Sequence, residues 1–344
     1  MIFSTLNFCV FFACFLAVYA ALPRRARNLW LLAASYVFYG CWDIRFLALI
    51  VTSTLVDFWV AQRIAASSDE RTRRRFLMVS LVTNLSILGF FKYFNFFLES
   101  ADALAGLLGV DGLGWRLDIL LPVGISFYTF KTMSYTLDVY GRQMEPTRSL
   151  VDYAAFVAFF PQLLSGPIDR AATLLPQIRQ RPGLTAEGLR VGAWLFAWGL
   201  FKKTVVADNL AAIAAPAFAG DGVSAAHGWA GLYAFVLQLY CDFSGYTDMA
   251  RGVARLMGFE TAVNFRNPFF ATNPVDYWQR WHISLSLWIQ DYLYFPMAAA
   301  FLRRSRGWFG QYAPHILTMA LIGLWHGAGW NYIVFGLYWG LAIV

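Results

Sequence analysis

The stretch that decides the fold is Leu324-Trp325-His326-Gly327-Ala328-Gly329-Trp330-Asn331, which lies within an apolar run from about Ile316 to Val344. A run of this length and composition predicts a membrane-spanning helix. His326 is the only side chain in the run that titrates near neutral pH. An ionisable group at membrane depth is costly to bury and usually lines a cavity or a pathway. Glycines at positions 323, 327 and 329 remove bulk around it, so another backbone or a substrate can approach. The stretch therefore suggests His326 as a reactive group in a membrane-embedded enzyme.

The composition predicts a polytopic membrane protein. Of its 344 residues, 59% are hydrophobic and 14% are charged, whereas a soluble domain is about 45–50% apolar and about 25% charged. The net charge of +7 needs no nucleic-acid partner, because Arg and Lys gather in short loops such as 24–27 and 63–75, which is typical of topology determinants. The four cysteines lack metal-ligand spacing, so we expect buried free thiols and no metal site.

The predicted spans follow the apolar runs. They cover residues 3–22, 28–41, 45–61, 76–98, 118–137, 190–206, 229–247 and 316–344. Lys92 is a cation in the run 76–98, and its side chain is long enough to reach the membrane interface. The run 118–137 carries unusually many polar side chains and is predicted to face the protein interior. Prolines and polar residues divide 151–187 into short pieces, which predicts re-entrant or interfacial helices.

A polar helix is predicted over Tyr277–Tyr294. On one continuous helix His282 and Ser286 would share a face, as would Asp276 and Arg280. So many polar groups beside an apolar region suggest a functional site. The alternative is an interfacial helix, because anchoring by Trp and Arg is ordinary there.

A second cluster comprises Asp242, Tyr246 and Asp248, near the end of the span 229–247. The two carboxylates could pair with Arg280 or Arg266, or they could bind a cation. We favour pairing, because two acids with neighbouring hydroxyls match no sharp metal-ligand rule.

Several catalytic signatures are missing from the sequence. It has no Gly-x-Ser-x-Gly elbow, no P-loop and no His-Glu-x-x-His, so covalent serine and zinc mechanisms have little support. A histidine acting as general base on an acceptor hydroxyl remains. The alternative for His326 is a structural histidine hydrogen-bonded between helices.

Five motifs in a fixed order resemble one known family. They are LPVGISFYTF (121–130), FPQLLSGP (160–167), YCDFSGY (240–246), WHISLS (281–286) and WHGAGW (325–330). Together they resemble the membrane-bound O-acyltransferase family, in particular its bacterial branch of alginate O-acetyltransferase proteins. The D-alanyl transfer protein of teichoic acid synthesis is a more distant relative.

The resemblance implies an all-α, polytopic transmembrane helical bundle with re-entrant or interfacial helices around a central tunnel. It implies a single membrane domain over residues 1–344, apparently truncated at its C-terminus, because relatives continue through further helices. His326 matches the family's signature histidine and His282 its second motif position. The residues expected to shape the site around them or to bind substrate are Asp242, Tyr246, Arg280, Ser286 and Asn331.

The resemblance also implies a chemistry. The donor would be acetyl-CoA or an acyl-carrier thioester on the cytoplasmic side, with no bound cofactor, and the acetyl group would cross the bacterial inner membrane. A periplasmic partner of the SGNH-hydrolase type, in a polysaccharide synthesis complex, would then complete O-acetylation of an exopolysaccharide. The alternatives are a lipid- or teichoic-acid-directed acyltransferase and a transporter, although the sequence shows no repeat of the kind that transporters carry.

Overall fold

The computed structural model describes residues 1–110, 112, 114, 116–219 and 223–344. Every regular element among these residues is helical, which confirms the predicted all-α class. The chain forms two compact units. The first comprises residues 1–54 and 147–264, and the second comprises residues 55–146 and 265–344.

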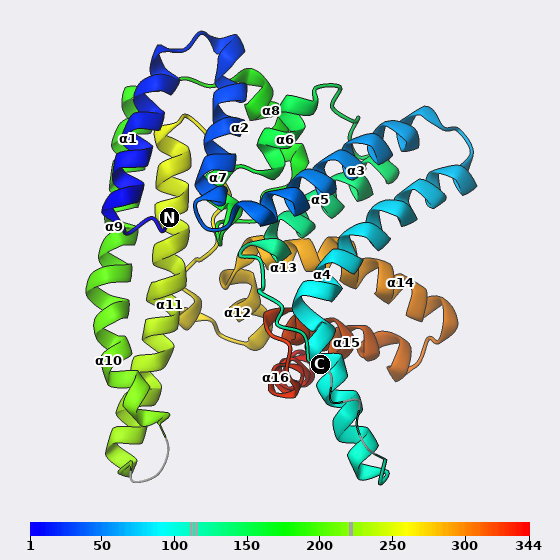
Figure 1. The fold of residues 1–344 in the computed structure, drawn as a ribbon. Coiled ribbons are helices and arrows are strands. Elements are labelled where there is room, and N and C mark those ends of the chain that lie inside the picture. The colour runs from blue at the N-terminus through cyan, green and yellow to red at the C-terminus, as the bar shows by residue number, and fades with distance from the viewer. Residues whose placement is uncertain (111, 113, 115, 220–222) are drawn as a thin grey trace. The chain divides into compact units, whose positions relative to one another are not determined.

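The first unit is built on long helices. They are α1 (Leu6–Ala21), α2 (Arg24–Gly40), α9 (Ala186–Phe201), the π-helical segment η2 (Lys202–Ala207), α10 (Asp208–Ala217) and α11 (Ala225–Leu256). α9 and α11 run side by side (Figure 1). Their glycines allow this, since a Cβ on Gly192 would lie 2.8 Å from the carbonyl oxygen of Gly252. Small residues bring helix backbones together in membrane proteins.

Short helices complete the first unit, namely α6 (Leu150–Val157), α7 (Phe160–Leu163) and α8 (Ala171–Gln180). They confirm that the region 151–187 is divided into short pieces. Asn28 of α2 ties this layer together, because its amide donates to the Asp152 carboxylate over 2.7 Å and to the Ile178 carbonyl over 2.9 Å.

The second unit contains the polar segments. Its elements are most of α3 (Leu47–Ala66), which follows η1 (Ile44–Phe46), then α4 (Glu70–Leu107), α5 (Ile125–Tyr140), η3 (Pro268–Phe270), α12 (Pro274–Arg280), α13 (Ile283–Ile289), the π-helical η4 (Gln290–Tyr294), α14 (Phe295–Arg304), α15 (Trp308–His326) and α16 (Trp330–Ile343). As predicted, α5 faces the interior, and nearly all of its polar side chains are buried.

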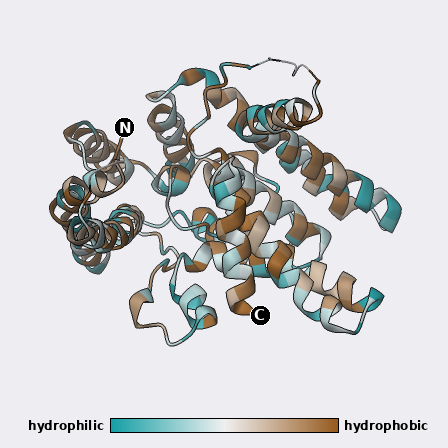
Figure 2. Ribbon diagram, turned by 90° about the horizontal axis from the view of Figure 1, so that it is seen from below, coloured by the Kyte–Doolittle hydropathy of each residue, from teal (hydrophilic) through white to brown (hydrophobic). Residues whose placement is uncertain are grey.

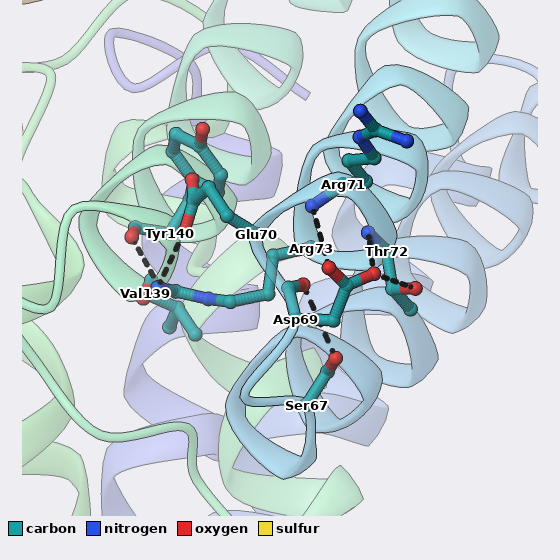
Figure 3. A network of polar contacts seen from close by, with 8 residues as sticks. All are labelled: Ser67, Asp69, Glu70, Arg71, Thr72, Arg73, Val139 and Tyr140. Atoms are coloured by element: carbon teal, nitrogen blue, oxygen red, sulfur yellow. Dashed lines mark hydrogen bonds and ion pairs between the residues drawn. The ribbon is translucent and has the colours of Figure 1, made fainter.

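Polar contacts fix the start of α4 (Figure 3). The Asp69 carboxylate caps the helix by accepting from the Arg71 and Thr72 backbone N–H groups, as side chains at this position commonly do. Arg73 is buried and donates to the Tyr140 carbonyl over 2.5 Å. A cation at the C-terminal end of α5 is favourable, since unpaired carbonyls give that end a partial negative charge.

Two helical segments, Ile44–Ala66 and Glu70–Leu107, are long and apolar enough to cross a membrane, and the other helices of the described part are shorter or less apolar. Hydrophobic residues nevertheless run along most helices (Figure 2), and large apolar side chains are exposed on α1, α11 and α16. The cysteines are free, but the prediction of burial is wrong for Cys9, Cys14 and Cys41, which point outward from their helices.

Candidate functional site

The predicted single span from Ile316 to Val344 is wrong, because the chain reverses within it. α15 ends at His326, and α16 begins at Trp330 (Figure 1). Between them Gly327 and Gly329 are extended, with φ of −163° and −172°. His326 therefore lies at the C-terminal end of a helix, beside a turn, and not in the middle of a span.

Glycines on both helices allow the α15–α16 hairpin to close. A Cβ on Gly323 would collide with the carbonyl oxygen of Tyr332, and one on Gly336 would collide with that of Met319. The side-chain-free surface predicted around His326 is thus used by a neighbouring backbone of the same chain.

α4 holds the end of α15. The Lys92 ammonium donates to the Trp325 carbonyl, lies 3.5 Å from the Ser126 hydroxyl and sits 5.2 Å from the centre of the Trp325 ring. The Tyr93 hydroxyl donates to the Leu324 carbonyl over 3.1 Å. Both groups satisfy carbonyls that the end of a helix leaves without intrahelical partners. Lys92 thus has a protein partner in the carbonyl end of α15, which the sequence did not indicate.

His282 lies at a break in the predicted helix Tyr277–Tyr294. α12 ends at Arg280, α13 begins at Ile283, and His282 between them has φ of +43°. Non-glycine residues rarely adopt this left-handed conformation, and they often do so at functional sites. The Ser286 N–H donates to the His282 carbonyl over 3.0 Å, so His282 precedes the helix that carries Ser286. The expectation that their side chains share a helix face is wrong.

Trp325 brings the two histidines into one site. Its ring centre lies 4.9 Å from that of His326 and 6.3 Å from that of His282. Phe130 of α5 stacks on Trp325 at 5.6 Å and on Trp288 at 4.1 Å. The site thus has a rigid aromatic wall built from α5, α13 and α15.

The electrostatics of the site involve three cationic or potentially cationic groups. His282 and His326 lie close enough to interact electrostatically, and Lys92 also acts on His326. His282 is 2% exposed, whereas His326 is exposed. The accessible imidazole is therefore that of His326, and the imidazole of His282 is buried.

The other site residues predicted in the second unit are close to His282 or His326 in sequence, but their own contacts do not involve either imidazole. Arg280 pairs with Asp276 over 2.7 Å, as their helical spacing predicted. The Ser286 hydroxyl donates to the Trp281 carbonyl over 3.3 Å. Asn331 is exposed in the first turn of α16, beyond the glycine turn.

Asp242 and Tyr246 belong to the first unit and have their own partners there. Asp242 pairs with Lys203 over 2.6 Å, and Tyr246 stacks on Phe3 at 4.8 Å. Asp248 pairs with Lys202 over 2.6 Å. Pairing of these acids with Arg280 or Arg266 was the wrong choice of partner. The sequence signal for the actual pairs was Lys202-Lys203 at the end of the preceding apolar run.

Among the described residues, no three His, Cys, Asp or Glu side chains gather in a way that could hold a metal ion. What the arrangement offers is an accessible imidazole beside a second one, a lysine that holds the helix end, and an aromatic wall. Such a set can move a proton to or from a bound hydroxyl.

A buried polar network lies elsewhere in the second unit, and sequence reasoning missed most of it. Asp57 of α3 accepts from the Asn84 amide over 2.8 Å, and the Thr132 hydroxyl donates to the Asn84 side-chain oxygen over 3.2 Å. All three residues are almost completely buried. The signal was a polar residue in each of three apolar segments, although the segment 118–137 holds several others.

Comparisons with known proteins agree with the motifs. Residues 142–344 match the family model described as MBOAT, membrane-bound O-acyltransferase family. A probable alginate O-acetylase of Azotobacter vinelandii is 43% identical over 99% of this chain and 67% of its own length. Its counterpart in Pseudomonas aeruginosa is 42% identical over 99% of this chain and 65% of its own length. A peptidoglycan O-acetyltransferase of Helicobacter pylori is 34% identical over 94% of this chain and 66% of its own length. The chain thus spans about two thirds of the length of these relatives.

Proposed function

Because the chain belongs to the membrane-bound O-acyltransferase family, we propose that this membrane protein transfers acetyl groups toward the hydroxyls of an exopolysaccharide. The observation that carries the proposal is the placement of His326 at the end of α15, accessible and held by contacts from α4. An imidazole fixed in this way can act repeatedly on a substrate that enters and leaves.

The proposed step is general-base catalysis by His326. Its neutral imidazole takes the proton from the hydroxyl of a first acceptor, which carries the acetyl group onward to the periplasmic enzyme, as the hydroxyl oxygen bonds to the carbonyl carbon of an acyl thioester. The carbon–sulfur bond then breaks, and the imidazolium returns the proton to the departing thiolate. A positioned base of this kind contributes roughly 10²- to 10⁴-fold to a rate.

His282 would assist His326 without contacting the substrate. Its buried ring and left-handed backbone fix it beside Trp325, close enough to act electrostatically on His326. We assign it a positioning or relay role. Arg280, Ser286 and Asn331 would shape the surroundings of the two histidines within the second unit. Asp242 and Tyr246 stay candidates for substrate binding within the first unit.

The donor in this proposal is acetyl-CoA or an acyl-carrier thioester, and no cofactor stays bound. The acetyl group would pass from the cytoplasmic side through a central tunnel of a multi-pass protein in the bacterial inner membrane. A periplasmic SGNH-type acetyltransferase, in a polysaccharide synthesis complex, would complete the transfer. Support comes from the family, from exposed apolar side chains along the helices, and from relatives that are named as polymer acetylating enzymes.

The acceptor we favour is an alginate-like polymer. The relatives named for alginate are 39–43% identical to this chain, and the relative named for peptidoglycan is 34% identical. An O-acetyltransferase directed at peptidoglycan is the second candidate.

The test replaces His326 with Ala and with Gln in the full-length protein and measures the acetyl content of exported polymer. We expect loss of acetylation in both variants with normal amounts of protein in the membrane. The matched control is His227→Ala, because His227 is an exposed histidine at the start of α11, and it should acetylate normally. Unchanged acetylation in both His326 variants would refute the assignment.

A further inference from the structure

A basic pocket of about 270 Å³ lies on the first unit, where α9 meets the last turns of α11. Val191 and Leu195 of α9 line it together with Arg251 and Arg255 of α11, and residues 259–261 complete the lining. The acyl transfer proposed above involves none of these side chains.

Both arginines of the pocket are accessible. The side chains of Arg251 and Arg255 are 21% and 28% exposed. The Arg251 guanidinium lies 3.4 Å from the Asp248 carboxylate, which is closer to Lys202, at 2.6 Å. Arg255 pairs with the Glu260 carboxylate. Because a guanidinium has five N–H donors, one carboxylate does not occupy all of them, and each arginine can also bind another oxygen-rich group.

The lining of the pocket has an excess of positive charge. Among its described residues the charged ones are Arg251, Arg255 and Glu260. The Glu260 side chain is 73% exposed, and an ion pair of an exposed group contributes little to stability. An anion with several oxygens can therefore displace this carboxylate. A phosphate group suits two neighbouring arginines, because its oxygens accept paired hydrogen bonds from guanidinium groups.

An apolar groove continues the pocket along α9. Its described lining residues all belong to this helix, and they are Arg190, Val191, Ala193, Trp194 and Ala197. Val191 lines the basic pocket as well, so the two hollows adjoin there. Trp194 is 67% exposed, and its ring stacks on that of Trp198 with 6.3 Å between their centres. The surface thus joins a basic pocket to an exposed apolar strip.

The groove leads away from the end of the helix pair that holds the pocket. α9 and α11 are antiparallel, since a Cβ on Gly188 would lie 3.1 Å from the Arg255 carbonyl oxygen, and one on Gly199 would collide with that of Gly245. The start of α9 therefore lies beside the two arginines. Later residues of α9 carry the groove toward the middle of the pair.

The pocket lies at the same end of the first unit as the basic loop 24–27. A Cβ on Gly258, just after α11, would meet the carbonyl oxygen of Gly183. Arg27 donates to the carbonyl of the neighbouring Pro182 over 3.0 Å. Loops rich in Arg and Lys are typical of the cytoplasmic side of a membrane protein, and the cytoplasmic leaflet contains anionic lipids.

We propose that this surface binds an anionic phospholipid, with its phosphate between Arg251 and Arg255 and one acyl chain in the groove over Val191 and Trp194. The inference goes beyond the proposed acyl transfer and does not depend on it. Basic pockets between helices on the cytoplasmic side bind such head groups. The apolar strip is formed by one helix, whereas a stable protein–protein interface buries about 1,200–2,000 Å², so a lipid fits this surface better than a protein partner.

Lipid titrations of the full-length protein, followed by native mass spectrometry, test the head-group site. The probes are phosphatidylglycerol and phosphatidylcholine with the same oleoyl chains. Arg251→Gln/Arg255→Gln should bind phosphatidylglycerol roughly 10- to 30-fold more weakly, because each basic residue near an anionic lipid contributes roughly fivefold. Its affinity for phosphatidylcholine should equal that of the wild type. Arg251→Lys/Arg255→Lys keeps both charges and should keep most of the affinity, which separates loss of charge from loss of packing.

The matched control is Arg24→Gln/Arg25→Gln. It removes two exposed cations at the start of α2, at the same end of the first unit but outside the pocket. Its affinity for phosphatidylglycerol should stay close to that of the wild type. An equal loss in this control would mean attraction by overall charge, and full affinity in Arg251→Gln/Arg255→Gln would mean that the pocket does not bind the head group. Either result overturns the proposal.

A second experiment tests the acyl chain. Ala197→Trp fills the groove without changing its charge and should lower the affinity for phosphatidylglycerol. Ala212→Trp, at an exposed position of α10 outside the groove, should not. Glycerol 3-phosphate, which has the phosphate but no acyl chain, should not displace the lipid at equal concentration. Equal affinities of the two Trp variants, or displacement by glycerol 3-phosphate, would overturn the assignment of a lipid. Because binding is measured without turnover, neither result bears on the proposed acyl transfer.

Discussion

Lys92→Met tests whether α4 fixes the end of α15 and, with it, His326. The variant keeps a flexible apolar chain of similar length but removes the ammonium that donates to the Trp325 carbonyl. A hydrogen bond from a charged group contributes about 1.5–3 kcal/mol, and a cation at a helix C-terminus about 0.3–1 kcal/mol. Because Lys92 is only half-buried and the two effects overlap, we expect a loss of about 2 kcal/mol in the free energy of unfolding.

The effect on catalysis should be larger than this loss of stability implies. Of the two hydrogen bonds from α4 that hold the last turn of α15, the one from Tyr93 to the Leu324 carbonyl then remains. A displacement of a catalytic group by about 1 Å can lower a rate by roughly 10²-fold, so we expect acyl transfer to fall by roughly 10- to 100-fold. Lys92→Arg keeps the charge and the donors and should recover most of the activity.

Arg73→Met is the matched control for this experiment. Arg73 also lies on α4 and also places a cation at the end of a helix, where it donates to the Tyr140 carbonyl of α5. It is 19 residues from Lys92, about 28 Å along the helix axis. We expect a similar loss of stability and little loss of activity per folded molecule. The measurements are denaturant unfolding and acyl transfer from acetyl-CoA by purified protein in detergent. If Lys92→Met stays fully active, or if Arg73→Met reduces activity as strongly, the positioning role is refuted.

Two further predictions concern stability. Gly323→Ala places a methyl group against the Tyr332 carbonyl and should destabilise the α15–α16 hairpin by about 1–3 kcal/mol. The control is Gly89→Ala in α4, where the methyl group meets open space, and it should be neutral or stabilising by about 0.5–1 kcal/mol. Thermal unfolding of the two variants measures both changes in stability, and equal shifts in unfolding temperature would contradict the close approach of the two helices. Asn84→Leu removes the amide that donates to the buried Asp57 carboxylate and should lower the free energy of unfolding by about 3 kcal/mol or more. The double variant with Asp57→Leu should regain part of that stability. If the two losses of stability are additive in a double-mutant cycle, the two side chains are not coupled.

Much of the fold could be predicted from residue pattern. The apolar runs located most of the long helices, and the polar residues of the run 118–137 correctly indicated a helix buried inside the protein. Helix pattern is a local property, because each side chain's direction follows from its position along the chain. Partner choice is not local. Lys202-Lys203 and the acids of α11 pair through packing between helices. The two lysines stand out at the end of an apolar run, but their spacing does not identify the acids that they meet.

Lys92 is a second residue whose partner could not be predicted from local sequence pattern. Within an apolar run, a lone lysine near its end suggested a side chain reaching toward water. The structure instead gives it the carbonyl end of α15, more than two hundred residues away in sequence. Helix ends carry a partial charge that no sequence pattern displays, so a half-buried cation can have a partner that is not an acidic residue.

The two histidines mark the places where helical periodicity predicted the wrong structure. His282 follows Trp281 in a segment without Gly or Pro between the two helices, so its left-handed backbone at +43° had no sequence signal. At His326 the signal existed, but the glycines that follow were interpreted as packing surface and not as a turn. A continuous helix would satisfy the backbone locally at both positions. Breaking it exposes backbone groups and strains His282, and such strain persists only where surrounding contacts enforce it. Both breaks adjoin Trp325, the ring that the aromatic wall and Lys92 hold. Two adjacent imidazoles held in this way are what the proposed general-base role of His326 requires.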